Sequence, residues 1–132
     1  MQTLLTVVVA VVGGFVALMT LMQVLVRLRA KALTGKPVPT LPGKLGKQVA
    51  KGRKALVYFM SPGCAACRAI TPEMKKLSER NPSVYVIDVS RDLDTARALK
   101  VMATPSFVEI DDGKVVGFHV GPAPAEVLGR FG

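Results

Sequence analysis

The apolar positions of the chain follow one pattern at the amino terminus and another over the remaining residues. Residues 1–26 contain no charged side chain, and the apolar stretch from Leu4 to Val26 has 23 residues. As a helix that rises about 1.5 Å per residue, this stretch would measure about 34 Å, which exceeds the roughly 30 Å hydrocarbon core of a bilayer. We therefore predict one transmembrane helix within residues 1–29.

A cleaved signal sequence is the competing interpretation of this segment. Such sequences begin with a basic region, have a shorter apolar core and end at a small-residue cleavage site. Here no basic residue precedes the apolar stretch, the stretch is long, and Arg27-Leu28-Arg29 follows it. We interpret the segment as a retained single-pass anchor.

The carboxy-terminal part of the chain contains several short strand-like runs. Apolar runs at 55–60, 84–89 and 106–110 are rich in strand-forming residues. The second run is apolar almost throughout, which is typical of a strand that is covered on both faces. Asp111-Asp112-Gly113 predicts a hairpin turn into a return strand over 114–120, because Asp-Gly readily adopts the positive φ that such turns need.

Helical patterns separate these runs. From Cys67 to Leu77, apolar residues recur at intervals of three and four, with charged residues on the other faces. Ser90 or Asp92 can cap a second short helix, and Pro124 opens a last one. The order strand, helix, strand, helix, hairpin and helix predicts an α/β fold in which a mixed sheet carries helices on its faces.

The net charge of +9 arises in a single stretch of the chain. Nine Lys and Arg residues lie between Arg27 and Lys54 with no acid among them, whereas residues 55–132 carry nine basic and nine acidic residues. No base-reading module accompanies the basic stretch, so we predict no nucleic-acid binding. Anionic membrane lipid is the expected partner, because each Lys or Arg near such a surface contributes on the order of 1 kcal/mol.

The segment Thr34–Gly43 contains three prolines and two glycines, which predicts a semi-extended linker. We therefore divide the chain into an anchor over residues 1–29, a basic Pro/Gly linker over residues 30–43 and a folded domain over residues 44–132. The domain is long enough for one modest core and contains no internal repeat.

Cys64 and Cys67 are the only cysteines of the chain, and two alanines separate them. The loop that they would close is too short to restrain much unfolded chain, so the pair indicates redox chemistry rather than a structural cross-link. Cys64 lies where the first strand turns into a helix, near unpaired N–H groups and the positive end of the helix dipole. Both features stabilise a thiolate, so we predict that Cys64 is the nucleophile and that Cys67 is the resolving cysteine.

Metal binding is the other chemistry that two cysteines allow. A structural zinc ion needs four ligands, and the chain offers only these two thiols and one distant histidine, His119. A copper carrier would use the same two thiols and stays open as an alternative. We predict no resident metal.

Four features, in this order, resemble the thioredoxin family over residues 44–132. They are the strand before Cys64-Ala65-Ala66-Cys67, Pro72 within the next helix, Thr104-Pro105 ahead of a strand, and Val120-Gly121 after the hairpin. The resemblance implies a thioredoxin-like mixed sheet flanked by helices and a cis Pro105 opposite the cysteines. It also implies that the backbone of Thr104 pairs with an extended substrate segment, and that the Cys64–Cys67 disulfide is the redox group, with no further cofactor.

Three positions depart from the family pattern. Gly63 stands where the family has a tryptophan, and Ala65-Ala66 replaces the usual Gly-Pro between the cysteines. Tyr58 occupies the position of the family's buried acid, which assists proton transfer at the resolving cysteine, so Cys67 needs another base or water. We expect Tyr58 to be a core aromatic with a satisfied hydroxyl, and His119 to be an outward structural residue.

These features together predict a membrane-anchored thiol-disulfide oxidoreductase that acts as a disulfide reductase. Its expected partners are a protein disulfide substrate, a reductase or membrane electron donor that recharges the pair, and membrane lipid, with the chain itself monomeric. A non-catalytic thioredoxin-like binding module and a copper-delivery protein are the alternatives.

The orientation of the domain is subject to two opposing arguments. Short basic flanks stay in the cytoplasm, which predicts a redox domain on the cytoplasmic face of the cell (inner) membrane. The resemblance implies the opposite, because many anchored relatives are periplasmic. We follow the charge rule, since it uses the residues of this chain, and keep the periplasmic face as the alternative.

Overall fold

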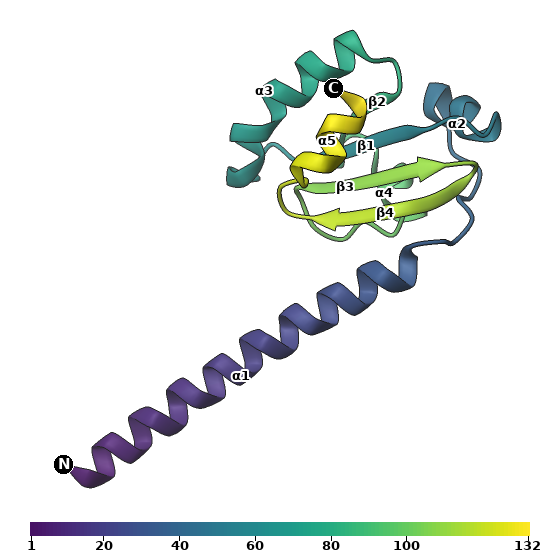
Figure 1. Cartoon of the computed structure of the whole chain (residues 1–132). Helices are drawn as coiled ribbons and strands as arrows, with labels where there is room; N and C mark the ends of the chain where they lie inside the picture. Colours follow the sequence, from purple (N-terminus) through teal and green to yellow (C-terminus); the bar gives the residue numbers. More distant parts are fainter. The chain divides into compact units, whose positions relative to one another are not determined.

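A computed structural model describes residues 1–132, and the chain divides into two compact units, residues 1–32 and 33–132. The first unit belongs to α1 (Gln2–Leu33), a single helix of 32 residues drawn in purple and blue in Figure 1, none of whose residues is buried. By length and composition α1 is able to cross a membrane, and an amino-terminal signal sequence meets the same criteria.

The second unit is built on a four-stranded mixed sheet in the order β2-β1-β3-β4 (Figure 1). The central β1 (Ala55–Met60) is parallel to β2 (Val84–Asp88) and antiparallel to β3 (Ser106–Asp111). β4 (Lys114–Val120) pairs with β3 across the expected hairpin turn. The mixed α/β sheet that the order of elements predicts is therefore confirmed.

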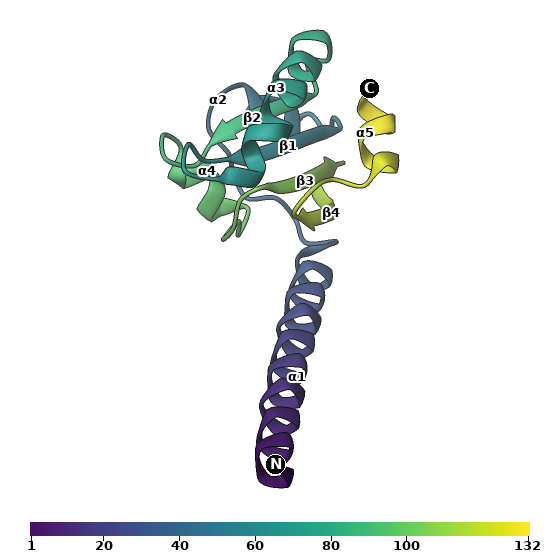
Figure 2. The same cartoon turned by 90° about the vertical axis from the view of Figure 1, so that its left-hand side faces the viewer.

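Four helices cover the two faces of this sheet. α3 (Ala65–Arg80) and α5 (Ala125–Phe131) contribute to the core on one face, and α2 (Gly43–Ala50) and α4 (Leu93–Ala98) to the core on the other (Figure 2). Successive side chains of a strand point to opposite faces, so β1, which is buried over residues 55–59, supplies both cores.

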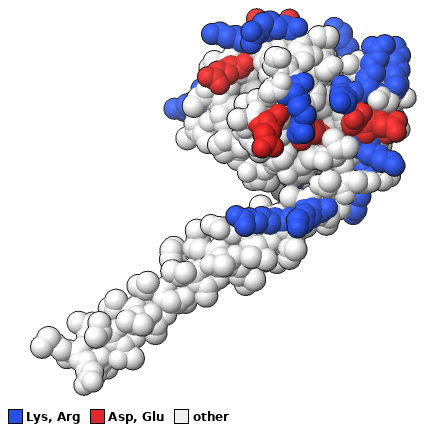
Figure 3. All heavy atoms as spheres, in the orientation of Figure 1, with Lys and Arg blue, Asp and Glu red and all other residues white.

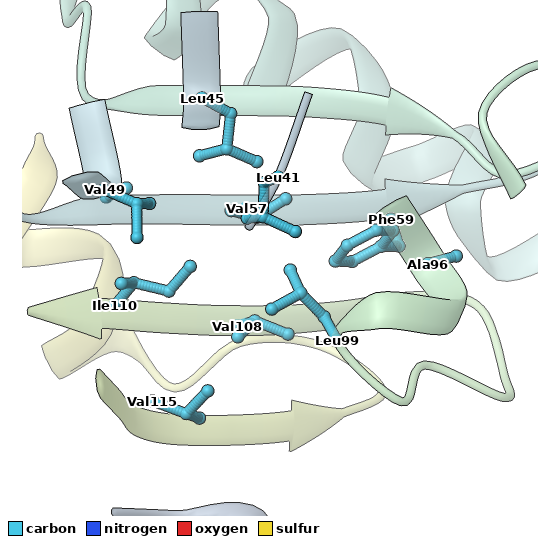
Figure 4. Packing of buried hydrophobic residues seen from close by; sticks show 11 residues of the cluster. Leu41, Leu45, Val49, Val57, Phe59, Ala96, Leu99, Val108, Ile110 and Val115 are labelled. Carbon is cyan, nitrogen blue, oxygen red and sulfur yellow. The ribbon is translucent and has the colours of Figure 1, made fainter. Parts of the chain in front are cut away.

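Figure 4 shows the core beneath α2 and α4. Leu45 and Val49 of α2 pack with Val57 of β1 and with Val108 and Ile110 of β3. The sequence patterns did not predict α2. Its signal is the spacing of Leu45 and Val49, four residues apart on one helix face.

The proline-rich segment before α2 is bonded to the outer edge of β4. The N–H of Val38 donates to the carbonyl of Gly113 at 2.8 Å, and the N–H of Val115 donates to the carbonyl of Lys36 at 3.0 Å. Pro37 forms an isolated bridge with Lys114. Residues that precede proline favour extended backbone, which suits Lys36 and Val38 to pairing with a strand.

Candidate active site

The junction between β1 and α3 places Cys64 at the amino-terminal cap of the helix. The N–H of Cys64 donates to the carbonyl of Ser61 at 3.2 Å, which closes the turn after the strand. Cys64 has extended backbone angles, and its Sγ accepts the N–H of Cys67 at 3.2 Å. Sulfur here takes the capping role that Ser or Asp oxygen usually has, and it lies at the positive end of the helix dipole.

Cys67 differs from Cys64 mainly in its exposure to solvent. The two cysteines form a disulfide across a Cα–Cα distance of 5.3 Å. Cys67 lies in the first turn of α3 and is 1% exposed, whereas Cys64 is only partly buried. A disulfide of another protein, approaching from solvent, therefore has access to Cys64 and not to Cys67.

Thr104 and Pro105 lie beside the turn that carries Cys64, although about forty residues separate them in sequence. The hydroxyl oxygens of Ser61 and Thr104 are 3.2 Å apart, which joins the turn to the segment before β3. The Thr104-Pro105 peptide bond is cis, as the resemblance implied, and Pro105 is buried. The carbonyl of Pro105 accepts the N–H of Gly121 at 2.8 Å, so the residue that follows the return strand holds this segment in place.

Tyr58 lies in the core below α3 and is fully buried. Its hydroxyl is 2.8 Å from Oγ1 of Thr71, and its ring centroid is 4.9 Å from that of Phe107. The expectation of a core aromatic with a satisfied hydroxyl is confirmed. Burial raises the pKa of Tyr58 above its usual 10.0, and the hydrogen bond with Thr71 acts in the opposite direction. The hydroxyl therefore stays protonated at neutral pH.

Thr71 follows Cys67 by four residues on α3, so their side chains share one face of the helix. This placement puts the Tyr58–Thr71 hydroxyl pair next along the helix from the buried thiol. The pair offers hydrogen bonds but no carboxylate. At position 58 of β1, where the family has a buried acid, this chain therefore has no carboxylate that could exchange a proton with Cys67.

Replacing Tyr58 tests whether that missing carboxylate limits turnover. We expect Tyr58→Asp to reduce disulfides about tenfold or more faster at neutral pH than Tyr58→Asn, because only the carboxylate takes up a proton from Cys67. Both variants lose the aromatic ring and roughly 3–5 kcal/mol of stability, so Tyr58→Asn is the matched control. Equal rates in two folded variants, judged by circular dichroism, would contradict the expectation.

A buried carboxylate does occur, at a position that the sequence patterns missed. Glu109 of β3 is 6% exposed, on the face of the sheet that α3 and α5 cover. Its Oε1 accepts Nη2 of Arg130 at 2.7 Å, and its Oε2 lies 3.1 Å from Nε2 of His119. A Cβ at Gly117 would overlap the Glu109 carboxylate, so the absence of a side chain there makes room for this cluster.

The expectation of an outward His119 is wrong. Its side chain is 28% exposed and leans onto Glu109, because position 119 falls on the same face of the sheet as Glu109 and Phe107. The Glu109 cluster holds α5 to the sheet through Arg130.

No group of three or more His, Cys, Asp or Glu side chains is arranged to hold a metal ion.

A disulfide at the amino-terminal cap of a helix, beside a cis-proline loop and on a mixed sheet, defines a thiol-disulfide oxidoreductase. The thioredoxin family model matches residues 38–131, and the chain belongs to the thioredoxin family. The match begins after α1.

Individual relatives agree with this assignment. An H-type thioredoxin of Fagopyrum esculentum is 34% identical over 90 residues, which cover 67% of this chain and 78% of the relative. A thioredoxin of Bacillus subtilis is 33% identical over 76 residues, covering 55% of this chain and 73% of the relative. The reduced Schistosoma mansoni thioredoxin pre-protein superposes with a TM-score of 0.55 at 32% identity, over 67% of this chain and 88% of that one.

Proposed function

We propose that this protein is a membrane-anchored disulfide reductase in which Cys64 is the nucleophile and Cys67 the resolving cysteine. The observation that carries the proposal is the asymmetry of the pair. Cys64 is partly exposed at the helix cap, with its Sγ accepting an N–H, and Cys67 is 1% exposed behind it. A thiolate at such a terminus is stabilised by the N–H groups and the dipole.

The reaction transfers two electrons from the reduced pair to a protein disulfide. The Cys64 thiolate attacks one substrate sulfur, a Cys64–substrate disulfide forms, and the other substrate sulfur leaves as a thiolate that takes up a proton. Cys67, having lost its proton, then attacks Sγ of Cys64. The second substrate thiol is released, and the Cys64–Cys67 disulfide remains. A reductase or a membrane electron donor returns the pair to the dithiol.

Thr104 and Pro105 are the proposed substrate-binding residues. The contact between Ser61 and Thr104 keeps this segment beside the Cys64 turn. The segment leads directly into β3. An extended substrate strand that lies along Thr104 would therefore bring the substrate's disulfide to Cys64. Backbone pairing of this kind tolerates many substrate side chains.

Insulin reduction tests the catalytic proposal. The full chain in detergent micelles, with dithiothreitol as the electron source, is expected to accelerate precipitation of the insulin B chain, and Cys64→Ser is expected to be inactive. A protein that binds copper tightly but gives no turnover would contradict the reductase and favour the copper-delivery alternative. Binding of unfolded protein that survives Cys64→Ser, again without turnover, would favour a non-catalytic binding module.

The membrane part of the proposal rests on α1 and the charges that follow it. We propose that α1 anchors the protein and that the domain, beginning after a basic linker, faces the cytoplasm. The first charged residues after the apolar stretch are Arg27, Arg29 and Lys31, and none precedes it. The bias of membrane insertion, which keeps Lys and Arg in the cytoplasm, and the membrane potential both favour retention of these residues on the cytoplasmic side.

A reporter fused after Gly132 tests this orientation. A reporter that is active only in the cytoplasm is expected to work, and one that is active only outside is expected to stay silent. Neutral residues in place of Arg27, Arg29 and Lys31, combined with lysines added after Met1, should invert the result. Digestion of the domain by a protease outside intact cells would assign it to the periplasmic face instead.

A further inference from the structure

The outer edge of β2 carries backbone groups that no other part of the chain pairs. β2 and β4 are the two outer strands of the sheet, and Lys36–Val38 lie along β4. In β2 only alternate residues bond to β1, as the bonds from Leu56 to Ser83 and from Val89 to Met60 show. Val86 therefore turns its N–H and its carbonyl outward, away from β1.

An open groove of about 530 Å³ follows this edge of the sheet, between α2 and the end of α3. Val84, Tyr85 and Val86 contribute its strand side, and Ser78 and Pro82 its α3 side. The α2 side consists of polar and basic residues: Lys44, Lys47, Gln48 and Lys51. Gln48 Nε2 donates to Ser83 Oγ at 3.5 Å, which ties α2 to the start of the strand.

The groove is strongly basic. Lys44, Lys47 and Lys51 are exposed, because the other face of α2 is buried through Leu45 and Val49. No acidic residue lines the groove. Figure 3 shows the blue basic side chains gathered where α2 lies in that view, at the upper right of the domain.

We propose that this groove binds an extended acidic segment of a partner protein, which adds a strand to β2. The outward N–H and carbonyl of Val86 would pair with the partner's backbone, the apolar strand side would receive alternate side chains, and the lysines would face its carboxylates. A second copy of this chain does not fit, because its own β2 edge carries the same lysines and the like charges would repel one another. Anionic lipid would engage the lysines but has no backbone to pair with Val86.

This site goes beyond the proposed reductase function, because it leaves Cys64 free. β1 and β2 are parallel, with Leu56 opposite Val84 and Tyr58 opposite Val86, so the groove runs along the first part of both strands. Cys64 follows Met60 at the opposite end of β1. A partner held in the groove would be retained near the redox pair without covering it.

The test uses the full chain in zwitterionic detergent micelles and an acetylated Glu-Val-Glu-Val-Glu-Val peptide as the probe. When the peptide binds, the NMR signal of the Val86 amide is expected to shift, and its amide proton is expected to become protected from hydrogen exchange. Replacing Lys44, Lys47 and Lys51 together with Gln should weaken binding about tenfold. The matched control replaces Lys76, Arg91 and Arg97, which lie outside the groove, with Gln and should leave the Kd within about twofold.

Val86→Pro isolates the contribution of the strand edge. It removes an outward N–H that β1 does not use, and an edge position tolerates proline, so binding should weaken about fivefold. If this variant does not fold, the Val86 amide of the native chain and the lysine variant still decide. An unchanged Val86 amide, or equal loss of binding in the control variant, would overturn the proposal. If the NMR signals of the three lysines respond to phosphatidylglycerol bicelles but not to the peptide, the proposal is overturned in favour of a lipid site.

Discussion

Replacement of Cys67 with serine is expected to stop the reaction at the mixed disulfide between Cys64 and the substrate. The variant keeps the exposed thiol at the helix cap but lacks the buried thiol that would attack Cys64 Sγ. The mixed disulfide then persists, because only an external thiol can resolve it. Non-reducing electrophoresis of cell extracts should show new adducts of the chain, and mass spectrometry of each adduct should identify the substrate protein.

Two comparisons decide the assignment of roles. Cys64→Ser should form no adducts, and Cys64→Ser combined with Cys67→Ser should resemble it. Adducts that form through Cys67 in the Cys64→Ser variant would reverse the two roles. In the reduced native protein, Cys64 should be alkylated at a lower pH than a free thiol of pKa about 8.5, since the helix terminus favours its thiolate.

The main elements of the site follow from sequence patterns because each rests on local chemistry. A strand-like run, a Pro-Gly turn and a helical pattern suffice to place Cys64 at the junction of β1 and α3. The proximity of Thr104 and Pro105 to the cysteines required the family resemblance, because it depends on how β3 pairs with β1. No local pattern contains that information.

Other parts of the fold depend on contacts between distant residues. The segment at Lys36–Val38 carries prolines, which indicate a linker, and its backbone bonds go to β4, which lies far away in sequence. Glu109 has the pattern of an exposed strand residue. Its burial requires the missing side chain of Gly117 and a cation from α5, and neither is near it in sequence.

The carboxylate of Glu109 makes Arg130 important for stability in a way that its exposure does not suggest. Glu109 is 9% exposed at its side chain, whereas Arg130 is 59% exposed. Arg130→Ala leaves the buried carboxylate with His119 as its one hydrogen-bonded side chain. Breaking a buried ion pair from one side costs about 3–5 kcal/mol. Because water reaches the Arg130 side of this pair, we expect a smaller loss of about 2 kcal/mol in the free energy of unfolding.

The neutral variant Glu109→Gln separates burial of a charge from loss of a contact. It removes the charge but keeps an acceptor for Arg130, so we expect it to cost only about 1 kcal/mol. In the double variant, Arg130→Ala should then add little, because no buried charge is left uncompensated. Urea unfolding of the full chain in micelles, followed by tyrosine fluorescence in this tryptophan-free protein, measures all three values. The matched control Arg53→Ala, at an exposed residue that follows a turn, should stay within about 0.5 kcal/mol. If Arg130→Ala costs the same with Glu109 and with Gln at position 109, then Arg130 stabilises α5 by packing and not by compensating the buried carboxylate.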